Sequence, residues 1–122
     1  WSSDVCSSDL TAYSGAVSDA SLKENVVTID NVLEKVEQLR GVYFDWNDGY
    51  LASLGFAEKP QKRDLGVIAQ EVNRVLPEVV VTKDDGLLTV KYEKIVGVLI
   101  ESVKELSAKV NELQRRLDNT DV

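Results

Sequence analysis

A serine and a lysine stand five residues apart near the amino end of this 122-residue chain, in the run SDASLK from Ser18 to Lys23. A hydroxyl and an amine at this spacing meet if the backbone bends between them. Burial disfavours the charged form of a lysine, and a neutral amine can take the proton of a serine hydroxyl. The spacing therefore fits a Ser–Lys nucleophile pair. It fits equally a Ser18 that caps a turn or helix while Lys23 is exposed.

The remaining composition argues against several other chemistries. The chain has no histidine and a single cysteine, Cys6, which excludes a His-based triad and an internal disulfide and argues against a transition-metal site. It has neither a Gly-rich phosphate loop nor a CxxC pair, so we expect no cofactor and no metal. The net charge of −7 argues against nucleic-acid and anionic-membrane partners. We see no secretory signal and no apolar run of transmembrane length.

The longest periodic stretch runs from Tyr92 to Leu117. Its apolar residues recur in alternating steps of three and four, and we call them the seam: Val96, Leu99, Val103, Leu106, Val110, Leu113 and Leu117. Charged residues fill the flanks: Glu101, Lys104, Glu105, Lys109, Glu112, Arg115 and Arg116. This pattern predicts a coiled-coil helix about 39 Å long. A narrow stripe needs other helices to cover it, which favours self-association over packing on its own domain. In peptides, a Val/Leu seam favours a two-stranded coiled coil, which is a dimer of helices.

The segment before this helix predicts several short elements. Five apolar residues share one helical face (Ile29, Val32, Leu33, Val36 and Leu39), and they predict a helix over 31–40. Asn31 and Glu34 have the spacing of a capping pair, and Gly41 has the position of a helix C-cap. Residues 42–46 alternate like a strand, with Tyr43 and Trp46 expected in the core, and residues 47–49 predict a turn.

The second half of the domain is expected to be a loop, a strand–helix unit and a hairpin. The loop covers 51–64. Residues 65–76 predict a short strand running into a helix that Pro77 stops, with a buried face of Val67, Ile68, Val72, Val75 and Leu76. Residues 78–82 and 87–92 flank an Asp-Gly turn and predict a β-hairpin. The predicted fold class is α+β: a small globular domain with short helices and a hairpin, followed by a long C-terminal coiled-coil helix.

The chain divides into four parts on this interpretation. Residues 1–17 are expected to be a disordered leader or the remnant of an upstream fibre, and 1–10 also resemble translated sequencing-adapter sequence. The globular domain covers 18–92, the coiled-coil helix 93–117 and a tail 118–122.

Four blocks of the sequence, taken together, resemble one family. They are SDASLKENV, GVYFDWNDG, RDLGVIAQEVNRVLPEVVV and DGLLTVKYEKIVGVLIESVKEL. They are similar to the C-terminal intramolecular chaperone domain of phage tailspikes and tail fibres, a self-cleaving peptidase family also seen in endosialidase tails. The resemblance covers about 18–110, and the segment DLGVIAQEVNRVLPEVV is very specific to it.

The resemblance implies a homotrimer that brings three chains into register while the upstream fibre of the same polypeptide folds. The domain then cuts itself off before the serine of the motif, which here means the Val17–Ser18 bond. Ser18 would be the nucleophile, Lys23 the general base, and Asp19 a supporting residue that fixes Lys23 or the local turn. The precursor would be made in the cytoplasm of a bacterial host, and the domain would be absent from the mature virion fibre.

One position departs from the family pattern and keeps alternatives open. The family commonly has a basic residue two positions before the lysine, where this chain has Ser21. A trimerisation module that no longer cuts is therefore one alternative, and a plain coiled-coil interaction domain is another. The family's trimer also differs from the two-stranded preference of the seam. We expect a trimer, because contacts in the globular part outweigh about three heptads of coiled coil.

Overall fold

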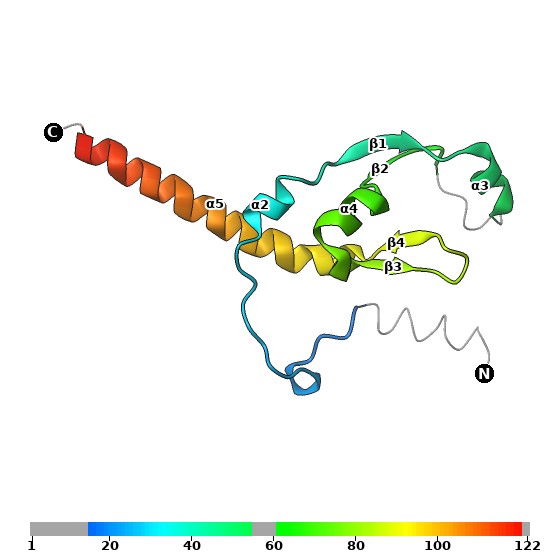
Figure 1. The fold of residues 1–122 in the computed structure, drawn as a ribbon, viewed down its shortest axis with the longest axis horizontal. Helices are drawn as coiled ribbons and strands as arrows, with labels where there is room; N and C mark the ends of the chain where they lie inside the picture. The colour runs from blue at the N-terminus through cyan, green and yellow to red at the C-terminus, as the bar shows by residue number, and fades with distance from the viewer. Residues whose placement is uncertain (1–14, 55–60, 121–122) are drawn as a thin grey trace.

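The computed structural model describes residues 15–54 and 61–120. Its helices are η1 (Ala20–Leu22), α2 (Leu33–Val36), α3 (Asp48–Ser53), α4 (Ala69–Val75), η3 (Pro77–Val79) and α5 (Tyr92–Thr120), and its strands are β1 (Val42–Asp45), β2 (Arg63–Gly66), β3 (Val80–Thr82) and β4 (Leu88–Val90). In Figure 1, α5 is a long rod, and β1 and β2 form an arm that extends away from it. The mixture of helix and strand with a long C-terminal helix confirms the predicted α+β class. Most of the predicted leader, residues 1–14, lies outside the described residues.

Two separate antiparallel strand pairs make up the β-structure. In the first, β1 pairs with β2 so that Val42 lies opposite Gly66. In the second, β3 pairs with β4, and the turn between them is closed by Gly86, whose φ of 87° suits a residue without a Cβ. The predicted hairpin is therefore confirmed, with its Asp-Gly turn in the expected place.

The hydrophobic core is small and lies where α2, α4, η3 and α5 meet. Its buried members are Val32, Val72, Leu76, Val79 and Val98. Val72 and Leu76 come from the face predicted for the 65–76 unit, while Val67 and Val75 from the same face are partly buried against the core. Pro77 ends α4 as predicted and begins η3.

The long helix α5 presents two different faces. Ile95, Val98, Ser102 and Glu105 face its own domain, with Val98 and Ser102 buried. Each of these four residues immediately precedes a seam residue, so the two faces lie about 100° apart around the helix. All seven seam residues are between 44% and 64% exposed. The described part of the chain therefore leaves the seam uncovered, and the domain packs on a neighbouring stripe of the same helix.

The helix predicted over 31–40 is wrong in length and in its cap. Only one α-helical turn forms, and tighter bonds follow it, from Gln38 N–H to the Lys35 carbonyl and from Leu39 N–H to the Val36 carbonyl. Asn31 does not form the capping pair with Glu34, because its backbone adopts a left-handed φ of 52°. Gly41 lies beyond the end of this turn and does not cap it.

A carboxylate from α5 replaces the predicted cap. The Val32 and Leu33 amides donate to Glu105 at 3.1 and 2.8 Å. These amides are among the orphan donors at a helix start, and a side chain distant in sequence satisfies them. Periodicity within one segment cannot reveal such a partner.

Two further predictions around the first strand are corrected. Residues 47–49 begin a helix rather than a turn, because the Asn47 side chain accepts a hydrogen bond from Tyr50 N–H at 2.7 Å and so caps α3. The loop expected over 51–64 is shorter at both ends: α3 continues to Ser53 and β2 begins at Arg63. Tyr43 is 72% exposed beneath the Arg63 guanidinium and is not a core residue.

Candidate active site

The residues predicted as a nucleophile and a base lie side by side. The chain bends through η1, and Lys23 Nζ donates a hydrogen bond to Ser18 Oγ at 2.7 Å. An ammonium group can only donate, which matches the direction of this bond. A neutral amine carries a lone pair and could accept the hydroxyl proton along the same line. The geometry thus meets the distance requirement of a Ser–Lys pair.

Asp19 holds the turn between these two residues rather than the lysine itself. Its carboxylate accepts from Ser21 N–H at 2.9 Å and from Ser21 Oγ at 2.6 Å, and it caps η1. The side-chain hydrogen bond from Ser21, followed by the backbone one, lowers the pKa of Asp19. Ser21 is therefore engaged in fixing the bend.

The whole segment that carries the pair is open to solvent. Every residue from 15 to 31 is exposed, including the apolar side chains of Val17, Leu22, Val26 and Val27. Figure 1 shows this segment running away from α2, with η1 near its far end. Ser18 and Lys23 are thus close together but not shielded from water in the single chain.

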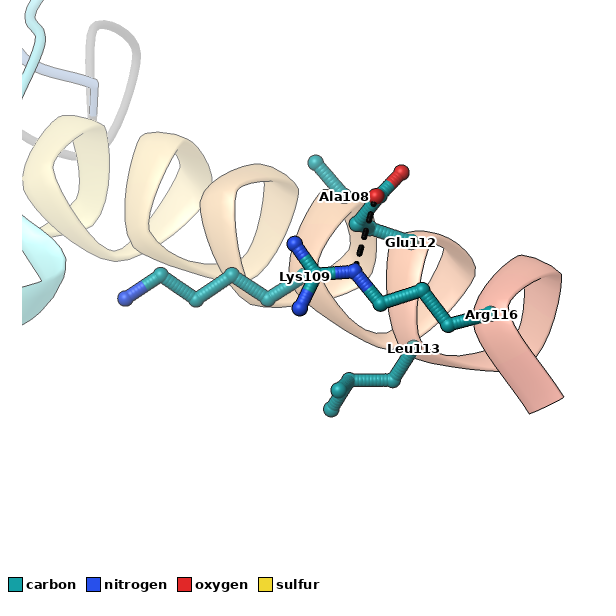
Figure 2. A pocket seen from close by; sticks show the side chains of 5 residues that line it. All are labelled: Ala108, Lys109, Glu112, Leu113 and Arg116. Carbon is teal, nitrogen blue, oxygen red and sulfur yellow. Dashed lines mark hydrogen bonds and ion pairs between the residues drawn. The ribbon is translucent and has the colours of Figure 1, made fainter. Parts of the chain in front are cut away.

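Within residues 15–54 and 61–120, no element covers the seam residues in the outer half of α5, which are between 51% and 60% exposed. Figure 2 shows Leu113 projecting from the helix beside Lys109 and Arg116. The Arg116 guanidinium donates to Glu112 at 3.1 Å on the polar side of this region. This half of α5 therefore has the apolar stripe and charged flanks that are typical of coiled-coil helices.

A separate cleft of about 770 Å³ lies between the two strand pairs. Aromatic side chains line it, and Trp46 packs at 4.8 Å from both Phe44 and Tyr50, measured between ring centroids. Trp46 also donates from its indole nitrogen to Asp64 at 3.1 Å. The Ser–Lys pair does not line this cleft.

Residues 15–54 and 61–120 contain no group of three or more His, Cys, Asp or Glu side chains placed to hold a metal ion. No helix in the described part of the chain is both long enough and apolar enough to cross a membrane.

Residues 18–81, just over half of the chain, match the family described as chaperone of endosialidase, Peptidase_S74. The chain belongs to this family. The match begins at Ser18 and includes Lys23, so the Ser–Lys pair lies at the amino end of the matched region.

Known relatives of this family member are phage tail-fibre proteins. The chain is 38% identical over 104 residues to the long tail fiber protein Gp37 of Enterobacteria phage K3 and to that of Enterobacteria phage T2, with 82% of this chain covered in both. It is 28% identical over 106 residues to the long tail fiber protein Gp37 of Salmonella phage S16. The chain spans only 8%, 7% and 13% of the length of these three relatives.

The sequence pattern did not predict the role of one residue, Glu105, at the start of α2. Glu105 was assigned to the solvated flank of the helix, yet it binds the backbone at the start of α2. Glu105 lies seven residues, or about two helical turns, after Val98, and this spacing indicates that both residues lie on one stripe of α5.

Proposed function

We propose that this chain is an intramolecular chaperone domain that assembles as a homotrimer and assists the folding of an upstream tail fibre. It then releases itself by cutting the Val17–Ser18 bond, with Ser18 as nucleophile and Lys23 as base. In this proposal the domain is made in a bacterial host as part of a tail-fibre precursor. The observation that carries the proposal is the 2.7 Å contact between Ser18 Oγ and Lys23 Nζ at the start of the family match.

The reaction is an acyl shift followed by hydrolysis. Lys23 Nζ, in its neutral form, takes the Ser18 hydroxyl proton while Oγ attacks the Val17 carbonyl carbon. The carbon–nitrogen bond breaks, the proton passes to the Ser18 nitrogen, and an ester joins Val17 to Oγ. One water molecule then splits the ester into a Val17 carboxylate and a free Ser18 hydroxyl. Asp19 supports this step by holding the η1 bend that brings the pair together.

Assembly controls the timing of the cut in this proposal. Burial favours a neutral amine, and the pair is exposed in the single chain. In the assembly, further copies of the chain would pack along the seam and exclude water from the segment that carries Ser18 and Lys23. Tethering three chains also raises their effective concentration to roughly millimolar, which speeds the slow long-range pairing of a β-rich fibre. Release afterwards makes the folded fibre kinetically stable.

The test uses the full-length protein with its natural upstream region. Mass spectrometry of the purified product should find a fragment that begins at Ser18. Ser18→Ala and Lys23→Ala should each abolish this fragment, because they remove the nucleophile and the base. Ser53→Ala is the matched control, since it removes an exposed hydroxyl on α3 that bonds the Tyr50 carbonyl and takes no part in the η1 bend. Hydroxylamine should accelerate cleavage of the wild-type chain by attacking the ester.

Two results would reject the cleavage proposal. One is an intact wild-type chain after assembly, and the other is a fragment that persists in both Ser18→Ala and Lys23→Ala. Sedimentation of the same samples tests the trimer separately, and a wild-type chain that stays monomeric at micromolar concentration contradicts it.

A second candidate function is a trimerisation module that assembles without cutting. Ser21 favours it, because this residue stands where the family commonly has a basic side chain. If this candidate is right, the wild-type protein forms trimers, remains intact, and gains cleavage in the Ser21→Arg variant.

A further inference from the structure

The segment that carries the Ser–Lys pair meets the rest of its domain at its carboxyl end. Every residue from 15 to 31 is exposed, and Val32, at 3% exposed, is the first buried residue after Ser18. Val32 packs into the core with Val98 of α5. The position of Ser18 relative to the rest of the molecule therefore depends on how the chain is held at residues 31–33.

A carboxylate of α5 makes that attachment. Glu105 accepts from the Val32 amide through Oε1 at 3.1 Å and from the Leu33 amide through Oε2 at 2.8 Å. No side chain local to α2 caps its start, so Glu105 supplies the acceptors that these donors need. The Leu33 and Val32 amides lower the pKa of Glu105, because hydrogen bonds from backbone N–H groups favour the charged carboxylate.

Two other features direct the chain along α5. Asn31 adopts a left-handed φ of 52°, a conformation that asparagine tolerates better than most residues, and this bend leads into the two amides that Glu105 binds. Ile29 passes close to α5, where its Cδ1 lies 3.8 Å from the position that a Cβ on Gly97 would occupy. Residues 29–33 thus lie against the helix that carries the seam, and the rest of the exposed segment runs away from that helix (Figure 1).

We propose that Glu105 is a positioning residue that couples association along the seam to the placement of Ser18 and Lys23. Glu105 immediately precedes the seam residue Leu106. One turn of α5 therefore faces both the partner helices and residues 31–33, which we call the root of the segment. This inference rests on the proposed self-cleavage. Ordering α5 in the assembly would hold the root of the segment at a defined place, and loss of the carboxylate would release it.

The test compares three variants of the full-length protein with its upstream region. Glu105→Gln keeps the size of the side chain but replaces one acceptor with a donor that faces an amide. Glu105→Asp keeps the charge on a shorter stem and serves as the conservative variant. Glu101→Gln is the charge-matched control, because Glu101 lies on the same helix but contacts only Lys104 among the described ion pairs.

Self-cleavage should slow about ten- to a hundredfold in Glu105→Gln, which is the range that misplacing a reacting group by about 1 Å can produce. Glu105→Asp should recover part of this rate, and Glu101→Gln should cut at the wild-type rate. All variants should sediment as the wild type does. In a Ser18→Ala background, amide exchange at Val32 and Leu33 should be faster with Glu105→Gln than without it.

The outcomes separate the two proposals. If Glu105→Gln assembles and cuts at the wild-type rate, or if exchange at Val32 and Leu33 is unchanged, the positioning role is overturned. If Glu105→Gln fails to assemble, the Glu105→Asp variant provides the test instead. If Glu105→Asp cuts at the wild-type rate although its Val32 and Leu33 amides exchange faster, the positioning role is also overturned. A wild-type chain that never cuts rejects the proposed cleavage and with it the positioning role, while the exchange measurement still decides the attachment by Glu105.

Discussion

Gly66 is the position where a single added methyl group has the most predictable effect. It ends β2, and a Cβ built on it would lie 2.8 Å from Tyr92 Oη, closer than real Cβ atoms approach. Its φ lies outside the left-handed region, so an alanine causes no backbone strain there. Tyr92 begins α5, and its hydroxyl accepts a long hydrogen bond of 3.4 Å from the Val67 amide. Because Tyr92 is 53% exposed, Gly66→Ala should push its hydroxyl aside and break the hydrogen bond to the Val67 amide.

The expected magnitudes follow from these distances. Losing this hydrogen bond and moving the ring costs about 0.5–1.5 kcal/mol, while replacing glycine in a compatible conformation returns about 0.4–1 kcal/mol through the unfolded state. Tyr92→Phe alone should cost at most about 1 kcal/mol, since its hydrogen bond is long. With that hydroxyl removed, the nearest atoms to the new Cβ are Phe44 Cε1 at 3.6 Å and ring Cζ at 3.8 Å, which are ordinary contacts.

A double-mutant cycle by urea unfolding measures the effect. The four proteins are compared at one protomer concentration, because association makes apparent stability concentration-dependent. We expect Gly66→Ala to be neutral or slightly destabilising alone but stabilising in the Tyr92→Phe background, which gives a coupling of about 0.5–1.5 kcal/mol. Additive costs in the double variant would refute the steric argument.

Three other predictions concern the core, a helix cap and an ion pair. Val72→Ala should lower the unfolding free energy by about 2–3 kcal/mol in urea titrations, because Val72 is only 1% exposed and its loss leaves a cavity. Asn47→Ala should speed amide exchange at Tyr50 and cost about 1 kcal/mol, and unchanged exchange would show that the cap is dispensable. The hydrogen bond from Arg40 lowers the pKa of Glu71 in the folded chain. The pair therefore stabilises the fold fully above the unfolded carboxyl pKa of about 4.3, and this stabilisation is lost as the pH falls through the lower pKa of folded Glu71. The stability difference between wild type and Glu71→Gln should therefore shrink in acid, and a constant difference from pH 7 to 3 would contradict it.

The local patterns of this sequence were sufficient to predict several elements. The alternating three–four spacing predicted α5, and the Asp-Gly turn between two β-rich runs predicted the β3–β4 hairpin. The apolar face of 65–76 predicted α4, including the burial of Val72 and Leu76. These features depend on residues close together in the chain, so periodicity and turn chemistry contain the necessary information.

Features that depend on distant residues were predicted less well. The helix over 31–40 was too long because its amino end is set by Glu105, which is more than seventy positions away. Tyr43 was expected in the core because it alternates like a strand residue, but β1 and β2 form a two-stranded arm with one side open to solvent. A pattern of alternation marks which side chains share a face and does not say whether anything covers that face.

The sequence by itself determined the Ser18–Lys23 spacing, the seam and the order of elements, because each is a property of neighbouring residues. Only the tertiary structure decided that Ser18 Oγ and Lys23 Nζ meet at 2.7 Å on an exposed segment and that the domain packs on the stripe beside the seam. It also decided that Glu105 holds the root of that segment. The physical reason is that backbone donors at a helix start must find acceptors, and the fold brings them one from another helix.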